Sequence, residues 1–148
     1  MNARIKSQKP SRQILDVSGQ RVTAQRVLLL DLIRKGGRHI DADELYCRAR
    51  EKQPRISLST VYRALQLFKK LDLVEEHHFD EAHYHYELKT SREHHHLLCL
   101  GCGKVVEFQC PQSREVKEEI ARDKGFEIVG AEVRIVGFCP ECRQRKEK

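Results

Sequence analysis

The sequence predicts an α+β fold in two parts, an N-terminal winged helix-turn-helix domain and a small C-terminal α/β domain with a structural four-cysteine zinc site. Three stretches with helical periodicity are followed by two stretches in which polar and apolar residues alternate, which is the order of elements in a winged helix. Further on, two Cys-x-x-Cys motifs begin 40 residues apart, at Cys99 and Cys139, which is typical of a tetrahedral zinc site.

The positive charge of the chain is concentrated in its first part. The 148 residues include 28 Lys and Arg against 22 Asp and Glu, a net charge of +6. Residues 1–90 hold 17 basic and 12 acidic groups (+5), whereas residues 91–148 hold 11 and 10 (+1). This balance permits nucleic-acid binding by the N-terminal part. No apolar run approaches the roughly 18 residues of a membrane span, so we expect a cytoplasmic protein with reduced thiols and no membrane partner.

Potential N-cap residues and glycines predict where the first helices begin and end. Residues 1–11 are polar and basic without periodicity, and we expect a flexible arm there. A short helix is predicted over residues 12–17, ended by Gly19. Thr23 is the expected N-cap of a largely buried helix that ends at the glycine pair 36–37.

Two more helices and a hairpin complete a domain that we place at residues 12–89. Asp41 caps a helix that ends before Pro54. Ser57 or Ser59 caps the next helix, whose apolar residues recur at helical spacing while polar and basic groups lie on its opposite face. The hairpin is predicted from two alternating stretches, residues 73–79 and 83–88, joined by residues 80–82.

The C-terminal domain is expected at residues 94–148, after a hinge at 90–93. Its pattern predicts a β-α-β order and a frayed tail. The predicted elements are an apolar strand over residues 97–108 with the first Cys-x-x-Cys turn inside it, a helix over 111–123 ended by Gly125, a strand-like run over 126–138, and the tail over 143–148.

The cysteines divide into a zinc quartet and two others. Cys99, Cys102, Cys139 and Cys142 form two knuckles, and Gly101 and Gly103 allow the first tight turn. Four thiolates leave no open coordination position, so the expected role is structural; four buried thiols in a reduced core are the alternative. The remaining cysteines are Cys47, which we expect in the helical core, and Cys110, which is expected to be exposed.

Histidines and glutamates form a second candidate metal site. His94 and His96 alternate along an extended segment, so their side chains point the same way. The presence of Glu107 and Glu87 favours a metal site over a surface cluster of histidines that binds no ligand. By the same local reasoning, His39 is a loop histidine and the hairpin histidines lie on solvated faces; these are His77, His78, His83 and His85.

Tyr62 and Arg63 lie on the outer face of the third core helix. They are candidates for base and phosphate contacts, with a solvated helix face as the alternative.

Taken together, these motifs resemble the ferric uptake regulator family of bacterial metal-responsive transcriptional regulators. The matching stretches are Val22-Thr23-Ala24-Gln25-Arg26, His39 with Ala42-Asp43-Glu44-Leu45-Tyr46, Ser59-Thr60-Val61-Tyr62-Arg63-Ala64-Leu65, His94-His95-His96-Leu97-Leu98-Cys99, Cys102-Gly103-Lys104-Val105-Val106-Glu107-Phe108, and Cys139-Pro140-Glu141-Cys142. The resemblance implies a repressor that binds a palindromic double-stranded DNA operator as a homodimer when metallated, with the C-terminal α/β domain as the dimerisation domain.

The resemblance also implies roles for single residues. The structural Zn2+ falls on the four paired cysteines. The regulatory metal falls on His39, Glu87, His94, His96 and Glu107. The DNA contacts fall on Arg21, Arg26, Ser59, Tyr62 and Arg63. A third metal site of many members corresponds to Glu93, His95, Arg114 and Ala131, two of which cannot ligate, so we expect it to be missing unless Glu115 or Glu132 substitutes.

The mixed nitrogen and oxygen ligands suit Fe2+, Mn2+ or Co2+ better than an ion that prefers thiolates, and Zn2+ would also bind them. Peroxide-sensing relatives have an aspartate among these ligands, whereas both carboxylates here are glutamates. The expected regulatory ion is therefore Fe2+, with zinc-, manganese- or peroxide-responsive function as alternatives.

Two other classes remain as hypotheses. Two histidines and a carboxylate could form the iron site of a non-haem metalloenzyme, but no substrate-pocket signature is present and we expect no small organic substrate. A constitutive DNA-binding module with structural zinc alone is the other alternative.

Overall fold

The computed structural model describes residues 9–36, 39–78, 84–89 and 93–146. The chain forms two compact units, Met1–Ser91 and Arg92–Lys148. Residues 1–8 of the predicted arm, the loop of the hairpin and most of the predicted hinge lie outside the described residues. No helix of the described residues is long and apolar enough to cross a membrane.

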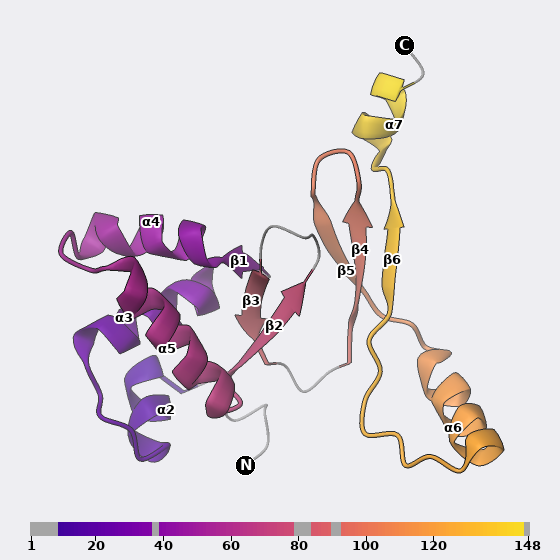
Figure 1. Ribbon diagram of the computed structural model, residues 1–148, viewed down its shortest axis with the longest axis horizontal. Helices are drawn as coiled ribbons and strands as arrows, with labels where there is room; N and C mark the ends of the chain where they lie inside the picture. The colour runs from indigo at the N-terminus through magenta and orange to yellow at the C-terminus, as the bar shows by residue number, and fades with distance from the viewer. Residues whose placement is uncertain (1–8, 37–38, 79–83, 90–92, 147–148) are drawn as a thin grey trace. The chain divides into compact units, whose positions relative to one another are not determined.

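The first unit contains a helical bundle and a three-stranded antiparallel sheet of order β1-β3-β2, which together are a winged helix (Figure 1). Its elements are α2 (Ser11–Val17), α3 (Ala24–Lys35), β1 (Ile40–Asp41), α4 (Ala42–Lys52), α5 (Leu58–Lys70), β2 (Val74–His78) and β3 (Tyr84–Leu88).

Three predicted N-caps are confirmed. The side chains of Thr23, Asp41 and Ser57 accept hydrogen bonds from the backbone N–H groups three residues further on, which satisfies a donor that has no partner within the helix. Gly36 ends α3, as predicted. Each helix therefore begins where its local sequence specifies.

Helix α5 has a clear inner face. Its buried residues recur at helical spacing and join the core formed with α3 and α4; they are Val61, Ala64, Leu65 and Phe68. This packing fixes the opposite side of α5 toward solvent.

Two details of the first unit differ from the prediction. Ser11, which we placed in the arm, begins α2 and is buried, and its hydroxyl donates to Asp31 Oδ1 at 2.5 Å. Strand β1 was not predicted, because two residues are too few to show a period. It pairs with β3, with Ile40 opposite Tyr86 and Asp41 opposite His85.

The second unit contains a three-stranded sheet of order β5-β4-β6, in which β4 is antiparallel to β5 and parallel to β6 (Figure 1). Its elements are β4 (His95–Cys99), β5 (Val105–Phe108), α6 (Ser113–Lys124), β6 (Arg134–Gly137) and α7 (Pro140–Lys146). The predicted β-α-β order is therefore present, and Gly125, with φ of 68°, ends α6 in the left-handed conformation as expected.

The strand predicted over residues 97–108, with the cysteine turn inside it, is present as two antiparallel strands on either side of that turn. Two other boundaries in this unit were wrong. Of the run 126–138, only Arg134–Gly137 is a strand. The tail that we expected to be frayed from residue 143 is helical to Lys146 in α7.

Candidate metal centres and nucleic-acid interface

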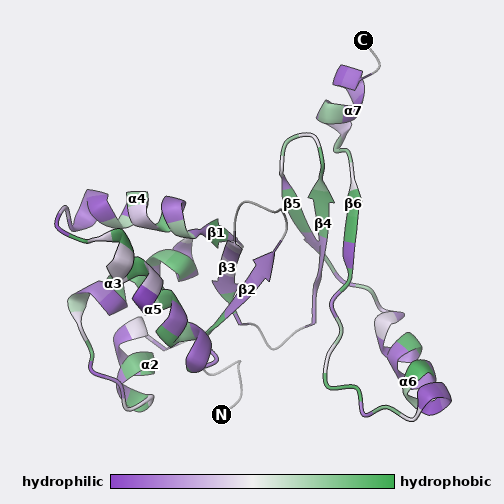
Figure 2. Ribbon diagram, viewed as in Figure 1, coloured by the Kyte–Doolittle hydropathy of each residue, from purple (hydrophilic) through white to green (hydrophobic). Residues whose placement is uncertain are grey.

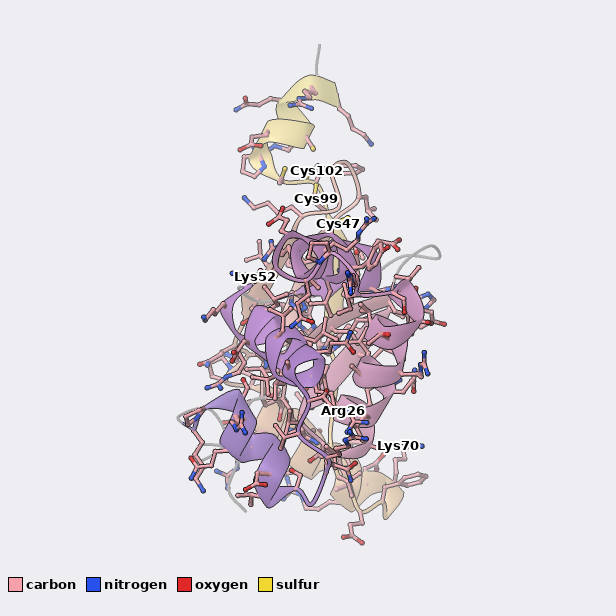
Figure 3. The ribbon with its side chains drawn as sticks, turned by 90° about the vertical axis from the view of Figure 1, so that its left-hand side faces the viewer. Arg26, Cys47, Lys52, Lys70, Cys99 and Cys102 are labelled. Atoms are coloured by element: carbon pink, nitrogen blue, oxygen red, sulfur yellow. The ribbon has the colours of Figure 1, made fainter. Side chains whose placement is uncertain are left out.

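The four paired cysteines lie together at one end of the second unit. Cys99 ends β4, Cys102 lies in the following turn, and Cys139 and Cys142 lie just before and within α7. Figure 3 shows Cys99 and Cys102 side by side near this helix. The four sulfurs are all within 4.8 Å of one another, and Cys102 Sγ is 3.8 Å from Cys139 Sγ. A zinc tetrahedron with Zn–S bonds of roughly 2.3 Å has edges of roughly 3.8 Å. The cluster fits a structural zinc site.

The surroundings of the sulfurs favour a bound cation. The backbone N–H of Cys139 donates to Cys99 Sγ at 3.2 Å and lowers the pKa of Cys99 to about 6. Contact with Cys139, together with removal from water, raises the pKa of Cys142 to about 12. Without an ion, the cluster therefore stabilises the thiolate of Cys99 and disfavours the ionisation of further cysteines. A cation that accepts four thiolates removes this conflict.

Gly101 is required by the packing of this turn. A Cβ at this position would lie 2.8 Å from Cys142 Cβ and 2.9 Å from its sulfur. Only glycine allows the turn to approach α7 so closely.

The wing sheet of the first unit places a row of polar side chains across its three strands. Glu75 is directly opposite Glu87 in the β2–β3 ladder. The β1–β3 register, extended by one residue, places His39 on the other side of Glu87. His39 and Glu87, which the resemblance assigns to the regulatory metal, therefore lie together in this unit.

Distances within this row are those of potential metal ligands. Glu87 Oε2 lies 3.8 Å from His39 Nδ1, and Glu87 Oε1 lies 2.6 Å from His77 Nε2. The rings of His39 and His77 are perpendicular, with centroids 5.8 Å apart. Our prediction that His77 is on a solvated face was wrong, since its side chain is only 11% exposed. His78, on the opposite face of the strand, is exposed as predicted.

The second unit gathers the other three predicted ligands. His96 of β4 is directly opposite Glu107 of β5. His94 lies two residues before His96, and their rings are 5.0 Å apart at 85°. His95 points to the other side, where its ring lies 5.6 Å from that of Phe108. The alternation predicted for these histidines is present, and it provides two imidazoles and a carboxylate on one face of the sheet.

Two of the four positions that correspond to a third metal site cannot bind a divalent cation. Glu93 is bound by the ammonium of Lys117 and by the hydroxyl of Ser113, and these hydrogen bonds lower its pKa. Positions 114 and 131 hold arginine and alanine. Among the described residues, none of the groups of three potential metal ligands includes Glu93, His95 or Glu115. Lys117 supplies the positive charge that a metal ion would bring.

The outer face of α5 presents the residues expected to contact DNA. Tyr62 is 45% exposed, and Ser59 and Arg63 are exposed beside it. The guanidinium of Arg63 donates to the carbonyl and hydroxyl oxygens of Ser59, at 3.2 and 3.3 Å. These contacts hold Arg63 along the helix surface, where its charge remains available to a phosphate.

The two arginines near the start of α3 are linked to each other. Arg26 Nη1 donates to the carbonyl oxygen of Arg21 at 2.7 Å, so Arg26 also holds the segment before the helix. Figure 3 labels Arg26, near the start of α3, and Lys70, the last residue of α5. Cys47, which we expected in the core, is exposed, because Leu45 and Ala49 take the inner face of α4.

A winged helix carrying exposed polar and basic groups, in one chain with a four-thiolate site and clustered histidines and carboxylates, defines a metal-dependent DNA-binding regulator of transcription. The sequence model of the ferric uptake regulator family matches residues 17–136. The chain belongs to this family, whose members regulate transcription and are not enzymes.

Relatives with different responses are similar to this chain. The ferric uptake regulation protein of Neisseria gonorrhoeae is 32% identical, over 88% of this chain and 92% of that protein. The peroxide operon regulator of Bacillus subtilis is 33% identical, over 93% of this chain and 94% of that protein. The crystal structure of the Vibrio cholerae ferric uptake regulator has a TM-score of 0.77 at 33% identity, over 86% of this chain and 98% of that one.

Proposed function

We propose that this chain is a homodimeric repressor that binds a palindromic operator in the cytoplasm when a single Fe2+ ion occupies its regulatory site. The observation that carries the proposal is the division of nitrogen and oxygen ligands between the two units. His39 and Glu87 belong to the DNA-binding unit, and His94, His96 and Glu107 to the other. Each set alone is an incomplete coordination shell for a first-row divalent ion.

The mechanism follows from that division. When bound, the ion supplies a positive charge that attracts donors from both units at once. Glu87 and His39 are fixed to the sheet that packs against α5, so they would hold the ion at a fixed place relative to α5, and ligands of the second unit on the same ion would restrict the movement of α5. In a dimer, this restriction selects the spacing of two α5 helices that suits successive major grooves. Metal binding and operator binding then strengthen each other by about 1–3 kcal/mol.

The choice of Fe2+ rests on the carboxylates. Both are glutamates, and the family resemblance associates an aspartate at this site with peroxide sensing. Imidazole and carboxylate ligands accept Fe2+, Mn2+ and Zn2+, and the ion that is available in the cell decides among them.

The apolar surface of the second unit supports the homodimer. Leu97 lies directly between Val106 and Ile135 in the sheet, and the three side chains are 40%, 39% and 47% exposed. Helix α6 has no buried residue, yet Val116 and Ile120 form an apolar pair four residues apart. Figure 2 shows the hydrophobic residues on the three strands and on α6. A unit this small with so little buried apolar surface gains stability by pairing with a second copy.

The proposal is tested by following operator binding during metal titration. A duplex selected from a random DNA library by the full chain with Mn2+ serves as the probe, and its fluorescence anisotropy is measured at fixed salt with Fe2+, Mn2+ or Zn2+. We expect tight binding only with an added divalent ion. Equal binding in the zinc-loaded protein with no other ion would instead favour the constitutive DNA-binding module.

Replacing Arg63 with alanine is expected to weaken operator binding by about 10-fold or more, because a base or phosphate contact contributes about 1–3 kcal/mol. Metal affinity should not change. Arg122→Ala, an exposed arginine of α6, is the matched control and should bind the operator as the wild type does. Equal operator affinities of the two variants would show that Arg63 does not contact the DNA.

Metal analysis should find two ions in each chain. Protein saturated with Mn2+ and then desalted is expected to hold one zinc on the cysteines and one manganese, because Lys117 already neutralises Glu93. Inductively coupled plasma mass spectrometry gives the count. The Lys117→Ala variant tests whether Lys117 is what excludes a second manganese ion. A second tightly held manganese in the wild type would contradict the expected count.

A further inference from the structure

We propose that the DNA-binding unit has a divalent-cation site of its own, formed by Glu75, His77 and Glu87, and that the regulatory ion binds there before the ligands of the second unit complete its coordination. The proposal rests on the proposed function in that both concern the same ion. It names two residues that hold the ion before the second unit's ligands replace them, which neither the motifs nor the resemblance indicated, and it gives the order in which the two sets of ligands bind.

The wing sheet brings the three side chains to one face. Glu75 and His77 are two residues apart on β2, so both point to the same side of the sheet. Glu87 of β3 is directly opposite Glu75 and diagonal to His77. One potential ligand atom from each of the three lies within 4.8 Å of the others. A single ion can therefore be reached by all three without a change in the backbone.

The charges at this position favour a cation. Two carboxylates directly opposite each other on neighbouring strands repel. Glu87 is only 5% exposed, whereas Glu75 is 37% exposed, so water screens the repulsion from one side only. Lys89 Nζ lies 3.8 Å from Glu75 Oε1, but it lies closer to Asp72 Oδ1, at 2.5 Å. A divalent ion between Glu75 and Glu87 would remove the repulsion more completely than this shared ammonium.

The donor set defines the class of ion. One imidazole and two carboxylates suit a first-row divalent cation such as Fe2+, Mn2+, Co2+ or Zn2+, rather than a soft ion such as Cu+. His39 lies beside the site, 3.8 Å from the second oxygen of Glu87, and adds a further imidazole within the same unit. The first unit thus has enough ligands to hold an ion weakly, and the second unit is needed to hold it tightly.

The order of binding has a consequence for regulation. Because the first site lies wholly within one unit, its occupancy does not require the arrangement of units that suits the operator. Weak capture on the wing would raise the chance that an ion is present when His94, His96 and Glu107 approach. His77 and Glu75 would then set how fast the protein responds to a rise in metal, beyond setting its final affinity.

The test uses the full chain with the second unit's ligands removed, His94→Ala, His96→Ala and Glu107→Gln together. Zinc-loaded protein is titrated with Co2+, and binding is followed by visible absorption. We expect one Co2+ to bind this triple variant at least about 100-fold more weakly than it binds the wild type, because three direct ligands are lost and the loss of a partner that only orients a ligand already costs about 10–100-fold. Adding His77→Ala or Glu75→Gln should abolish that binding. Adding His78→Ala should not, because His78 is on the opposite face and stacks on Tyr84.

The outcomes separate the two proposals. If the triple variant binds no Co2+, or binds it equally well after His77→Ala and Glu75→Gln, the site on the wing is ruled out while the proposed function stands. If the triple variant binds Co2+ and still shows full metal-dependent operator binding, the proposed function fails instead. Circular dichroism of each variant confirms that the wing sheet is intact, and the use of two different ligand substitutions guards against one that does not fold.

Discussion

Replacing Cys142 with serine is expected to release the structural zinc and unfold the second unit. Among the described residues of that unit, the buried ones are few, and two of them are zinc ligands; the buried set is His95, His96, Leu98, Cys99 and Cys142. So small a core does not compensate for the loss of a structural zinc, which contributes about 10–16 kcal/mol of apparent binding free energy in zinc-finger peptides. The zinc ion is therefore expected to stabilise a unit whose apolar residues are too few to stabilise it alone.

Three measurements check this expectation. Metal analysis should show loss of the zinc, limited proteolysis should cleave the region after residue 92, and the variant should sediment as a monomer. The first unit should stay folded, because its core contains none of the four cysteines. Cys47→Ser, an exposed cysteine of α4, is the matched control and should behave as the wild type. A Cys142→Ser protein that keeps one zinc and its dimer would show that the quartet is not the structural site.

Replacing His96 with alanine is expected to abolish metal-dependent operator binding while leaving a folded, zinc-containing dimer. His96 is only 1% exposed and lies directly opposite Glu107, so its loss removes a donor from the centre of the second unit's set. With the coupling lost, operator affinity in the presence of metal should fall to its metal-free level, a decrease of about 5–150-fold.

Anisotropy titrations with and without Mn2+ measure this effect, and sedimentation verifies the dimer. His78→Ala, an exposed histidine of the wing, controls for the loss of an imidazole elsewhere. Full metal-responsive binding by His96→Ala would remove this residue from the regulatory site.

Much of the first unit could be predicted because its signals are local. Thr23, Asp41 and Ser57 are caps within three residues of the groups that they bind, and the inner face of α5 follows from helical spacing alone. Strand β1 could not be predicted in this way. Its two residues are a strand only because β3 lies beside them, and the place of His39 next to Glu87 depends on that pairing.

The proximity of Glu75 and His77 to Glu87 could be predicted from the sequence. A hairpin with its loop at residues 80–82 has Glu81 at its centre, and this symmetry places Glu75 opposite Glu87, as the ladder does. Local patterns around each hairpin histidine do not reveal this set, because its members come from two different strands. Helix α7 was missed for a related reason. Pro140 and Glu141 suit the start of a helix, and the basic residues that follow suit its end. The Cys-x-x-Cys motif in the same stretch predicted a zinc knuckle, which hid the signal for a helix.

The central claim, that the regulatory ion and the operator favour the same arrangement of the two units, is tested most directly by measuring metal affinity with and without DNA. Zinc-loaded protein is titrated with Mn2+ in the presence and absence of saturating operator, at fixed salt and pH. Because linkage is reciprocal, the account predicts that the operator tightens Mn2+ binding by the same factor, about 5–150-fold, by which Mn2+ tightens operator binding. Equal Mn2+ affinities with and without operator would contradict it.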